Sequence, residues 1–174
     1  VEGLGKTNIA GLTAGALSVE GITSVSVVEL FPPVANVNVD LYIDDGSSGG
    51  VSSAQITEVQ SIIDGDGTED NPGYRAAGVN VAVKSPGIVT QNVEVTVLIV
   101  SGVDTDQLET DINTAVTNYI NTLGVGNDII YNELIYAVMD VYGVTDCSVT
   151  TPVANVTITD TQVGRVGTIS VTIS

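Results

Sequence analysis

Alternation of apolar and polar residues is the clearest pattern along this chain. Between Val37 and Asp44, aliphatic side chains alternate with Asn, Asp and Tyr. This period of two is typical of a strand with one buried face and one solvated face. Similar alternation, or enrichment in Val, Ile and Thr, predicts further strands over residues 23–30, 79–83, 93–99, 144–150, 155–159 and 168–173.

Helical spacing of apolar residues predicts helices in four places. The strongest pattern covers residues 105–123, with Asp104 or Thr105 as the N-cap and Gly124 as the stop. A capping box formed by Ser52 and Gln55 starts another helix, which ends near residue 63. The other two helices are predicted over residues 7–20, where two glycines weaken the pattern, and 132–142, which Gly143 ends.

These elements follow the order α-β-β-α-β in the first half of the chain and β-α-α-β-β-β in the second. A Pro-Gly pair at residues 86–87 separates the halves. The sequence therefore predicts an α+β fold with two small sandwich-like subdomains, residues 1–86 and 87–174. Each is expected to be a mostly antiparallel sheet with helices packed on one face. Because each half is small for an independent core, we expect the two to pack together or against neighbouring molecules.

One phrase occurs twice in the chain. Residues 19–27 and 141–149 each carry an apolar helix end, a glycine and the start of a strand. A Pro-Val-Ala-Asn-Val segment follows each phrase, at residues 33–37 and 152–156. Each phrase predicts a joint in which a helix turns into a strand. Gly21 and Gly143 are expected to have either a left-handed backbone or a close approach by another group.

The charge balance narrows the range of partners. The chain has 21 acidic and 4 basic residues among 174, which gives a net charge of -17. Such a field repels phosphate, so we expect neither nucleic acid nor a membrane as a partner. A solvated acidic surface is the simplest interpretation. The shortage of lysine also favours a host with a very salty interior or medium, because salt screens the self-repulsion of the chain.

No targeting signal is visible in the sequence. No apolar run reaches transmembrane length, and no signal-peptide pattern is present. Because the chain starts at Val1 rather than Met, we expect that a region precedes it.

Residues that usually carry catalysis are scarce. Histidine is absent, and no nucleophile elbow, phosphate-binding glycine loop or dinucleotide fingerprint occurs. We therefore expect no enzyme activity, no catalytic or cofactor-binding residue and no cofactor. Cys147 is the only cysteine and cannot form an intrachain disulfide. We expect it to be a buried structural thiol rather than a reactive one.

The acidic segment Asp64–Asn71 is the one stretch that suggests metal binding. Its Asp-x-Asp-Gly spacing supplies oxygen ligands suited to calcium. Arg75, however, occupies the place of the bidentate glutamate of an EF-hand. A solvated turn is the simpler interpretation, so no metal ligand is assigned, and calcium binding stays open.

Two tyrosines allow two interpretations. Tyr136 and Tyr142 are spaced to share one face of the predicted helix, away from Leu134 and Val138. We expect them to cover the core of the second half. Alternatively, they form an exposed aromatic strip that marks an interface.

The order and spacing of several segments resemble the baseplate J-like family of contractile tails and related injection machines. Residues 21–27 resemble the family's first glycine joint, and residues 134–149 resemble its second. Three segments between the joints also match, namely a hairpin strand, an arginine-led segment that ends at a Pro stop, and a helix, at residues 36–45, 75–86 and 112–124. The chain departs from the family at Ala76-Ala77, where Pro often follows the arginine, and in the longer acidic insertion at residues 64–71. The resemblance covers the middle and C-terminal parts of the family.

This resemblance implies a structural role. Members of the family form the wedges that ring the central hub of a phage-like tail baseplate. They contact copies of themselves and other wedge and hub proteins, and they help couple host attachment to sheath contraction. We therefore expect a non-enzymatic virion component of the tail baseplate, assembled in the cytoplasm of a salt-loving host.

The alternative interpretation is an extracellular adhesion or surface-layer module that calcium would stabilise. Strands rich in Thr and Val and the acidic segment would fit such a module. The two strongly patterned helices, over residues 105–123 and 132–142, argue against a pure β-sandwich.

Overall fold

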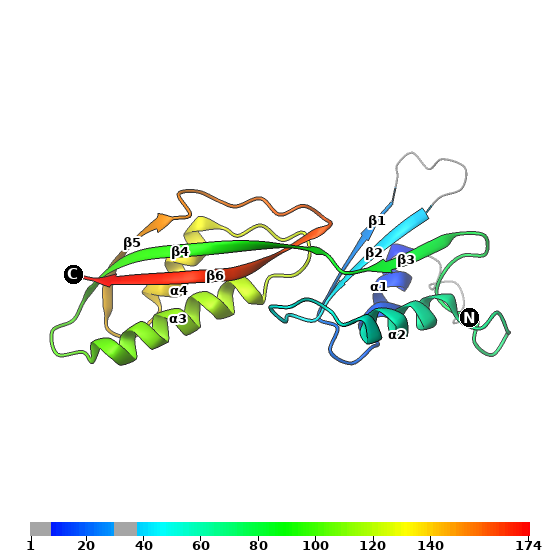
Figure 1. The fold of residues 1–174 in the computed structure, drawn as a ribbon, viewed down its shortest axis with the longest axis horizontal. Coiled ribbons are helices and arrows are strands. Elements are labelled where there is room, and N and C mark those ends of the chain that lie inside the picture. The colour runs from blue at the N-terminus through cyan, green and yellow to red at the C-terminus, as the bar shows by residue number, and fades with distance from the viewer. Residues whose placement is uncertain (1–7, 30–37) are drawn as a thin grey trace. The chain divides into compact units, whose positions relative to one another are not determined.

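A computed structural model describes residues 8–29 and 38–174 of the chain (Figure 1). In chain order the elements of these ranges are α1 (Ile9–Leu17), β1 (Ser24–Val28), β2 (Asn38–Asp44), α2 (Ser53–Asp64), β3 (Asn80–Lys84), β4 (Gly87–Ile99), α3 (Thr105–Asn121), α4 (Tyr131–Met139), β5 (Val144–Thr151) and β6 (Gln162–Ile173). They divide into two compact units. Unit 1 comprises the described residues up to Gly87 with residues 124–126 and 160–162, and unit 2 comprises residues 88–123, 127–159 and 163–174.

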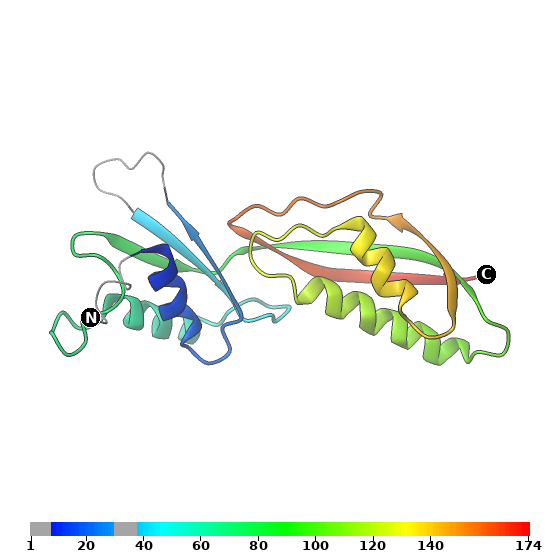
Figure 2. The ribbon, with the colours of Figure 1, turned by 180° about the vertical axis from the view of Figure 1, so that it is seen from behind.

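Unit 1 is a three-stranded sheet with α1 and α2 packed on it (Figures 1 and 2). The strand order is β1-β2-β3, with β2 antiparallel to β1 and parallel to β3. Alternate residues of β2 are buried, as the period of two predicts. Together with apolar residues of both helices and of β3 they form one core, made of Leu12, Ala16, Val19, Ile22, Val39, Leu41, Ile43, Val51, Val59, Ile63, Val81 and Val83.

Unit 2 is also a three-stranded sheet, in the order β5-β4-β6. β5 is antiparallel to β4, and Figure 1 shows β6 running beside β4 in the same direction. Figure 2 shows α3 and α4 on one face of this sheet. The inward residues of β4 meet the apolar stripes of the two helices in a second core, made of Val93, Val95, Val97, Leu108, Ile112, Val116, Ile120, Ile129, Leu134, Val138 and Val149.

The predicted α+β class with two subdomains is confirmed. Each sheet contains one parallel pair, so the sheets are mixed rather than mostly antiparallel. The strand predicted over residues 155–159 is absent. The backbone of Val156 pairs only with Ile129, and the Ile158 amide donates to the Asp128 carboxylate at 2.7 Å. The hydrogen-bonding groups of this segment are therefore satisfied outside the sheet.

The doubled phrase forms the same joint in both units. α1 ends at Leu17 and α4 at Met139, four positions before Gly21 and Gly143, so neither helix reaches the glycine that was predicted to end it. A tight turn follows each helix. In it, the amides of Ile22 and Val144 each donate to the carbonyl three residues earlier at 3.2 Å. Both glycines have positive φ, 88° at Gly21 and 99° at Gly143, which confirms the predicted backbone requirement.

Helix starts follow the predicted chemistry more closely than helix ends do. The capping box of Ser52 and Gln55 is present at α2, and the Asp104 side chain caps α3 by accepting from two backbone amides. α3 ends at Asn121, before Gly124, and its C-cap residue Thr122 is right-handed. Gly124 is therefore not the stop that the sequence predicted. Of the doubled Pro-Val-Ala-Asn-Val segment, the copy at residues 33–37 lies outside the described residues.

Candidate interaction surfaces

The acidic segment Asp64–Asn71 forms a closed loop in unit 1 after α2. The Asp66 amide donates to the Asn71 carbonyl at 3.1 Å, and the amides of Tyr74 and Arg75 both donate to the Ile63 carbonyl. Gly65 lies so close to the returning chain that a Cβ there would collide with backbone atoms of Gly73. The absence of a side chain at Gly65 therefore allows the loop to close.

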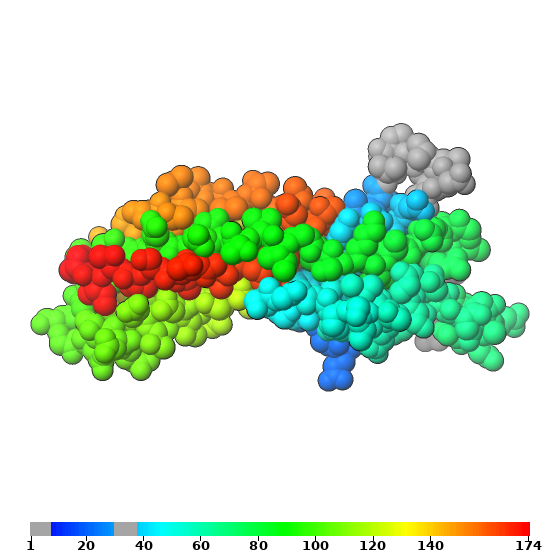
Figure 3. Space-filling model, in the orientation of Figure 1, coloured from blue at the N-terminus to red at the C-terminus, as the bar shows by residue number. Residues whose placement is uncertain are grey.

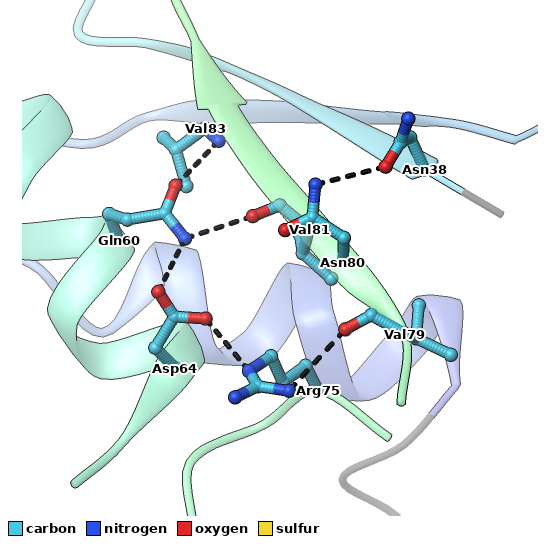
Figure 4. Close-up of polar contacts among 8 residues, drawn as sticks. All are labelled: Asn38, Gln60, Asp64, Arg75, Val79, Asn80, Val81 and Val83. Carbon is cyan, nitrogen blue, oxygen red and sulfur yellow. Dashed lines mark hydrogen bonds and ion pairs between the residues drawn. The ribbon is translucent and has the colours of Figure 1, made fainter. Parts of the chain in front are cut away.

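The first carboxylate of the segment, Asp64, binds protein groups on both of its oxygens (Figure 4). Arg75 Nε forms an ion pair with Asp64 Oδ1 at 2.8 Å, and Gln60 Nε2 donates to Asp64 Oδ2 at 2.9 Å. In the sequence, Arg75 stands where an EF-hand would carry its bidentate glutamate. In the structure, Arg75 neutralises the Asp64 carboxylate, which would be the first calcium ligand of an EF-hand loop.

The other acidic residues of the loop project into solvent. Thr68 donates to the Asp66 carboxylate from its hydroxyl at 2.6 Å and from its amide at 2.9 Å, and these hydrogen bonds lower the pKa of Asp66. Glu69 and Asp70 are exposed. In the described ranges 8–29 and 38–174, no group of three or more His, Cys, Asp or Glu side chains is placed to hold a metal ion.

Gln60 also closes the outer edge of the unit 1 sheet (Figure 4). Its Nε2 donates to the Val81 carbonyl, and its Oε1 accepts from the Val83 amide, both at 2.9 Å. Because β3 is an edge strand, these backbone groups would otherwise be available to pair with another chain. Nothing in the sequence pattern indicates this role of Gln60, since its strand partners Val81 and Val83 lie more than 20 positions away.

Cys147 is half-buried on β5, and its Sγ lies 3.8 Å from the Ile135 carbonyl oxygen. Burial raises the pKa of this thiol, and the nearby Asp146 charge raises it further. This environment agrees with the expected structural thiol.

The two tyrosines do not cover the core of unit 2, contrary to expectation. Tyr136 is 67% exposed and Tyr142 is 92% exposed. They do not share a helix face either, because α4 ends at Met139. Tyr142 instead lines a hollow of about 380 Å³ with the 100–104 loop and the first turns of α3. The interface interpretation is the one that these exposures favour.

The sheet of unit 2 has one face without a helix. In Figure 3 the strands β4 and β6 form the surface on this side. The exposed or half-exposed side chains of this face include the hydroxyl-bearing residues Thr90, Thr96, Ser148, Thr150, Thr168, Ser170 and Thr172, and also the carboxylates Glu94 and Asp146. Hydroxyl groups outnumber charges on this face, and charged residues are depleted at the centres of protein interfaces, so this hydroxyl-rich face is a second candidate surface.

No helix in the described part of the chain is long and apolar enough to cross a membrane.

Comparison with known proteins agrees with this architecture. Residues 91–172, nearly all of which lie in unit 2, match the sequence profile of the baseplate J-like protein C-terminal domain. The fold is similar to that of a chain in the cryo-EM structure of the anti-feeding prophage (AFP) baseplate, six-fold symmetrised, with a TM-score of 0.58 and 12% sequence identity. This match covers 92% of the present chain but only 37% of the AFP chain, so the present chain spans little more than a third of that protein. No curated protein matches the sequence.

The family match over residues 91–172 and the shared α+β fold support a baseplate structural protein. The match over residues 91–172, just under half of the chain, and the fold similarity support assignment to the baseplate J-like family.

Proposed function

We propose that this chain is a wedge component of the baseplate of a contractile tail, where it has a structural role and no catalytic activity of its own. The observation that carries the proposal is the fold match to a baseplate chain, which extends across both units. The family match over residues 91–172 supports it independently, because it rests on sequence.

In this role the chain packs against copies of itself in a ring around the central hub, and against other wedge and hub proteins. It is assembled in the host cytoplasm and becomes part of the virion tail. The two domains that we propose over residues 1–86 and 87–174 would transmit the movement that couples host attachment to sheath contraction. The open sheet face of unit 2 and the exposed tyrosines offer surfaces for these contacts.

We further propose that the host is salt-loving. Of the four basic residues, Arg75 and Lys84 form ion pairs with Asp64 and Asp40 at 2.8 and 2.7 Å, and Arg165 is 2% exposed. The 21 acidic residues therefore have few cationic partners, and the net charge of the chain is -17. At molar salt the Debye length falls to ~3 Å, which removes most of the repulsion between surface carboxylates.

Deletion of the chain from the particle-producing system tests the proposed role. We expect particles without a complete baseplate and without an assembled sheath, and complementation with the intact chain should restore both. The double variant Tyr136→Ser and Tyr142→Ser should fold like the parent by circular dichroism, since both side chains are exposed, yet complement poorly. Normal contractile particles in the deletion strain would end the proposal.

A further inference from the structure

Helix α4 carries an aromatic and acidic face that no other part of unit 2 covers. Its exposed residues are Asn132, Glu133, Tyr136, Met139 and Asp140, the last of which is the C-cap. At ~100° per residue, these positions fall within about one third of the helix circumference. Tyr136 lies at the centre of this arc, so the face has one aromatic anchor with a thioether on one side and two carboxylates on the other.

The opposite side of α4 already has its partners. Leu134 and Val138 are fully buried in the unit 2 core, and α4 packs against α3 and β5. Tyr136, at 67% exposure, and Met139, at 39%, contribute little to that core. The exposed face is therefore not needed to hold α4 in place, and large side chains there serve no internal packing role.

The charge of unit 2 restricts what can dock on this face. Its acidic residues are Glu94, Asp104, Asp106, Glu109, Asp111, Asp128, Glu133, Asp140 and Asp146. Its one basic residue, Arg165, is 2% exposed and donates to the Gly164 carbonyl at 2.8 Å. Unit 2 therefore presents only negative side-chain charge to a partner.

We propose that the exposed face of α4 docks a basic surface of a different protein in the assembly, with Tyr136 as the anchor and Glu133 and Asp140 as the acidic rim. Arginine side chains suit this face best. A guanidinium stacks on a tyrosine ring and at the same time forms charge-assisted hydrogen bonds with a carboxylate. A second copy of unit 2 would instead place like charges opposite one another, which is unfavourable in an interface.

This inference rests on the proposed baseplate role and deepens it by naming the chemistry of one partner. Contacts between copies of the chain would then use other surfaces, such as the hydroxyl-rich open face of the unit 2 sheet.

Backbone chemical shifts of the intact chain, recorded during titration with a peptide, test the proposal. The probe is the synthetic peptide acetyl-Leu-Arg-Leu-Arg-Gly-Arg-amide, and its counterpart with glutamate in place of arginine is the control. The salt concentration is the lowest at which the native circular dichroism spectrum is retained. We expect shifts that concentrate on residues 132–140 with the arginine peptide and none with the glutamate peptide.

Matched variants identify the face. The pair Tyr136→Ser with Met139→Ser should weaken binding of the arginine peptide at least tenfold, and Glu133→Gln with Asp140→Asn should weaken it several-fold. The control pair Asp106→Asn with Glu109→Gln removes the same charge from exposed positions of α3. It should change the affinity by less than twofold.

Several outcomes would overturn the proposal. Shifts spread evenly over the acidic residues of α3 and α4 would show nonspecific attraction, and no shifts in residues 132–140 at millimolar peptide would show no docking. Self-association of the free chain that Tyr136→Ser abolishes would make a second copy the occupant. Any of these results, together with micrographs that still place the chain in the baseplate, would refute the docking surface and leave the proposed function standing.

Discussion

Two separate features of the structure require glycine at position 143. It joins α4 to β5 with φ of 99°, a conformation that side-chain-bearing residues rarely adopt. A Cβ at this position would also lie 3.0 Å from Cγ2 and 3.1 Å from Cγ1 of Val103. Gly143→Ala therefore introduces backbone strain and crowding together.

The two costs can be estimated separately. A left-handed backbone at a non-glycine residue costs ~1–2 kcal/mol. Crowding of a well-packed site costs about 1–3 kcal/mol, and Val103 is half-buried, so part of that cost is relieved by movement of its side chain. We expect Gly143→Ala to lower the free energy of unfolding by about 2–4 kcal/mol.

Gly102 provides the matched control. Its φ is 89°, close to that of Gly143, but a Cβ there would meet nothing within 4 Å. Gly102→Ala should therefore cost only the backbone term, ~1–2 kcal/mol. Urea unfolding in molar salt, followed by far-ultraviolet circular dichroism, measures both. With an m-value near 2 kcal/mol per molar, the midpoint of Gly143→Ala should fall by roughly 1–2 M urea. Equal losses in the two variants would refute the crowding by Val103, and no loss in either would refute the positive φ.

Three other predictions follow from the structure. Gln60→Leu should lower the free energy of unfolding by about 1–3 kcal/mol, because Val81 and Val83 each lose a hydrogen-bond partner. The control Ser61→Ala on the same helix should have little effect in the same urea titration. The melting temperature should rise steadily between 0.1 and 2 M potassium chloride, since salt screens the net charge of -17, and a constant melting temperature would contradict the proposed salty host. Cys147 should react with a thiol reagent at pH 8 several-fold more slowly in the native chain than in urea, because burial raises the pKa of its thiol. Equal rates in the two states would contradict that burial.

Features that depend on neighbouring residues could be predicted from the sequence. The capping box of Ser52 and Gln55, the N-cap at Asp104 and the alternation in β2 all depend on residues a few positions apart. The repeated joint was visible because Gly21 and Gly143 occupy equivalent positions in two similar phrases. Its backbone geometry followed from the conformational freedom of glycine.

Features that depend on distant residues could not be predicted in this way. Residues 155–159 have the composition of a strand. Their backbone, however, forms hydrogen bonds with Asp128 and Ile129, which lie far away in the sequence, instead of joining a sheet. Tyr119 gives a second example. Its hydroxyl accepts from the Ile130 amide at 2.8 Å and donates to the Ile130 carbonyl at 3.2 Å, at the start of a helix that lacks a side-chain cap.

The interaction surfaces were the hardest feature to predict. Helical spacing suggested that Tyr136 and Tyr142 share a face, but α4 ends before Tyr142 and leaves each tyrosine exposed on its own. Whether an apolar side chain covers a core or a partner depends on the packing of the whole unit. Spacing along the helix does not determine it.

Electron microscopy of tail particles that carry a gold label on this chain tests the proposed role most directly. We predict label at the tail tip, in several copies arranged around the central hub. Label on a regular cell-surface lattice, or tail tips without label in particles that contain the chain, would contradict the assignment of this chain to the baseplate wedge.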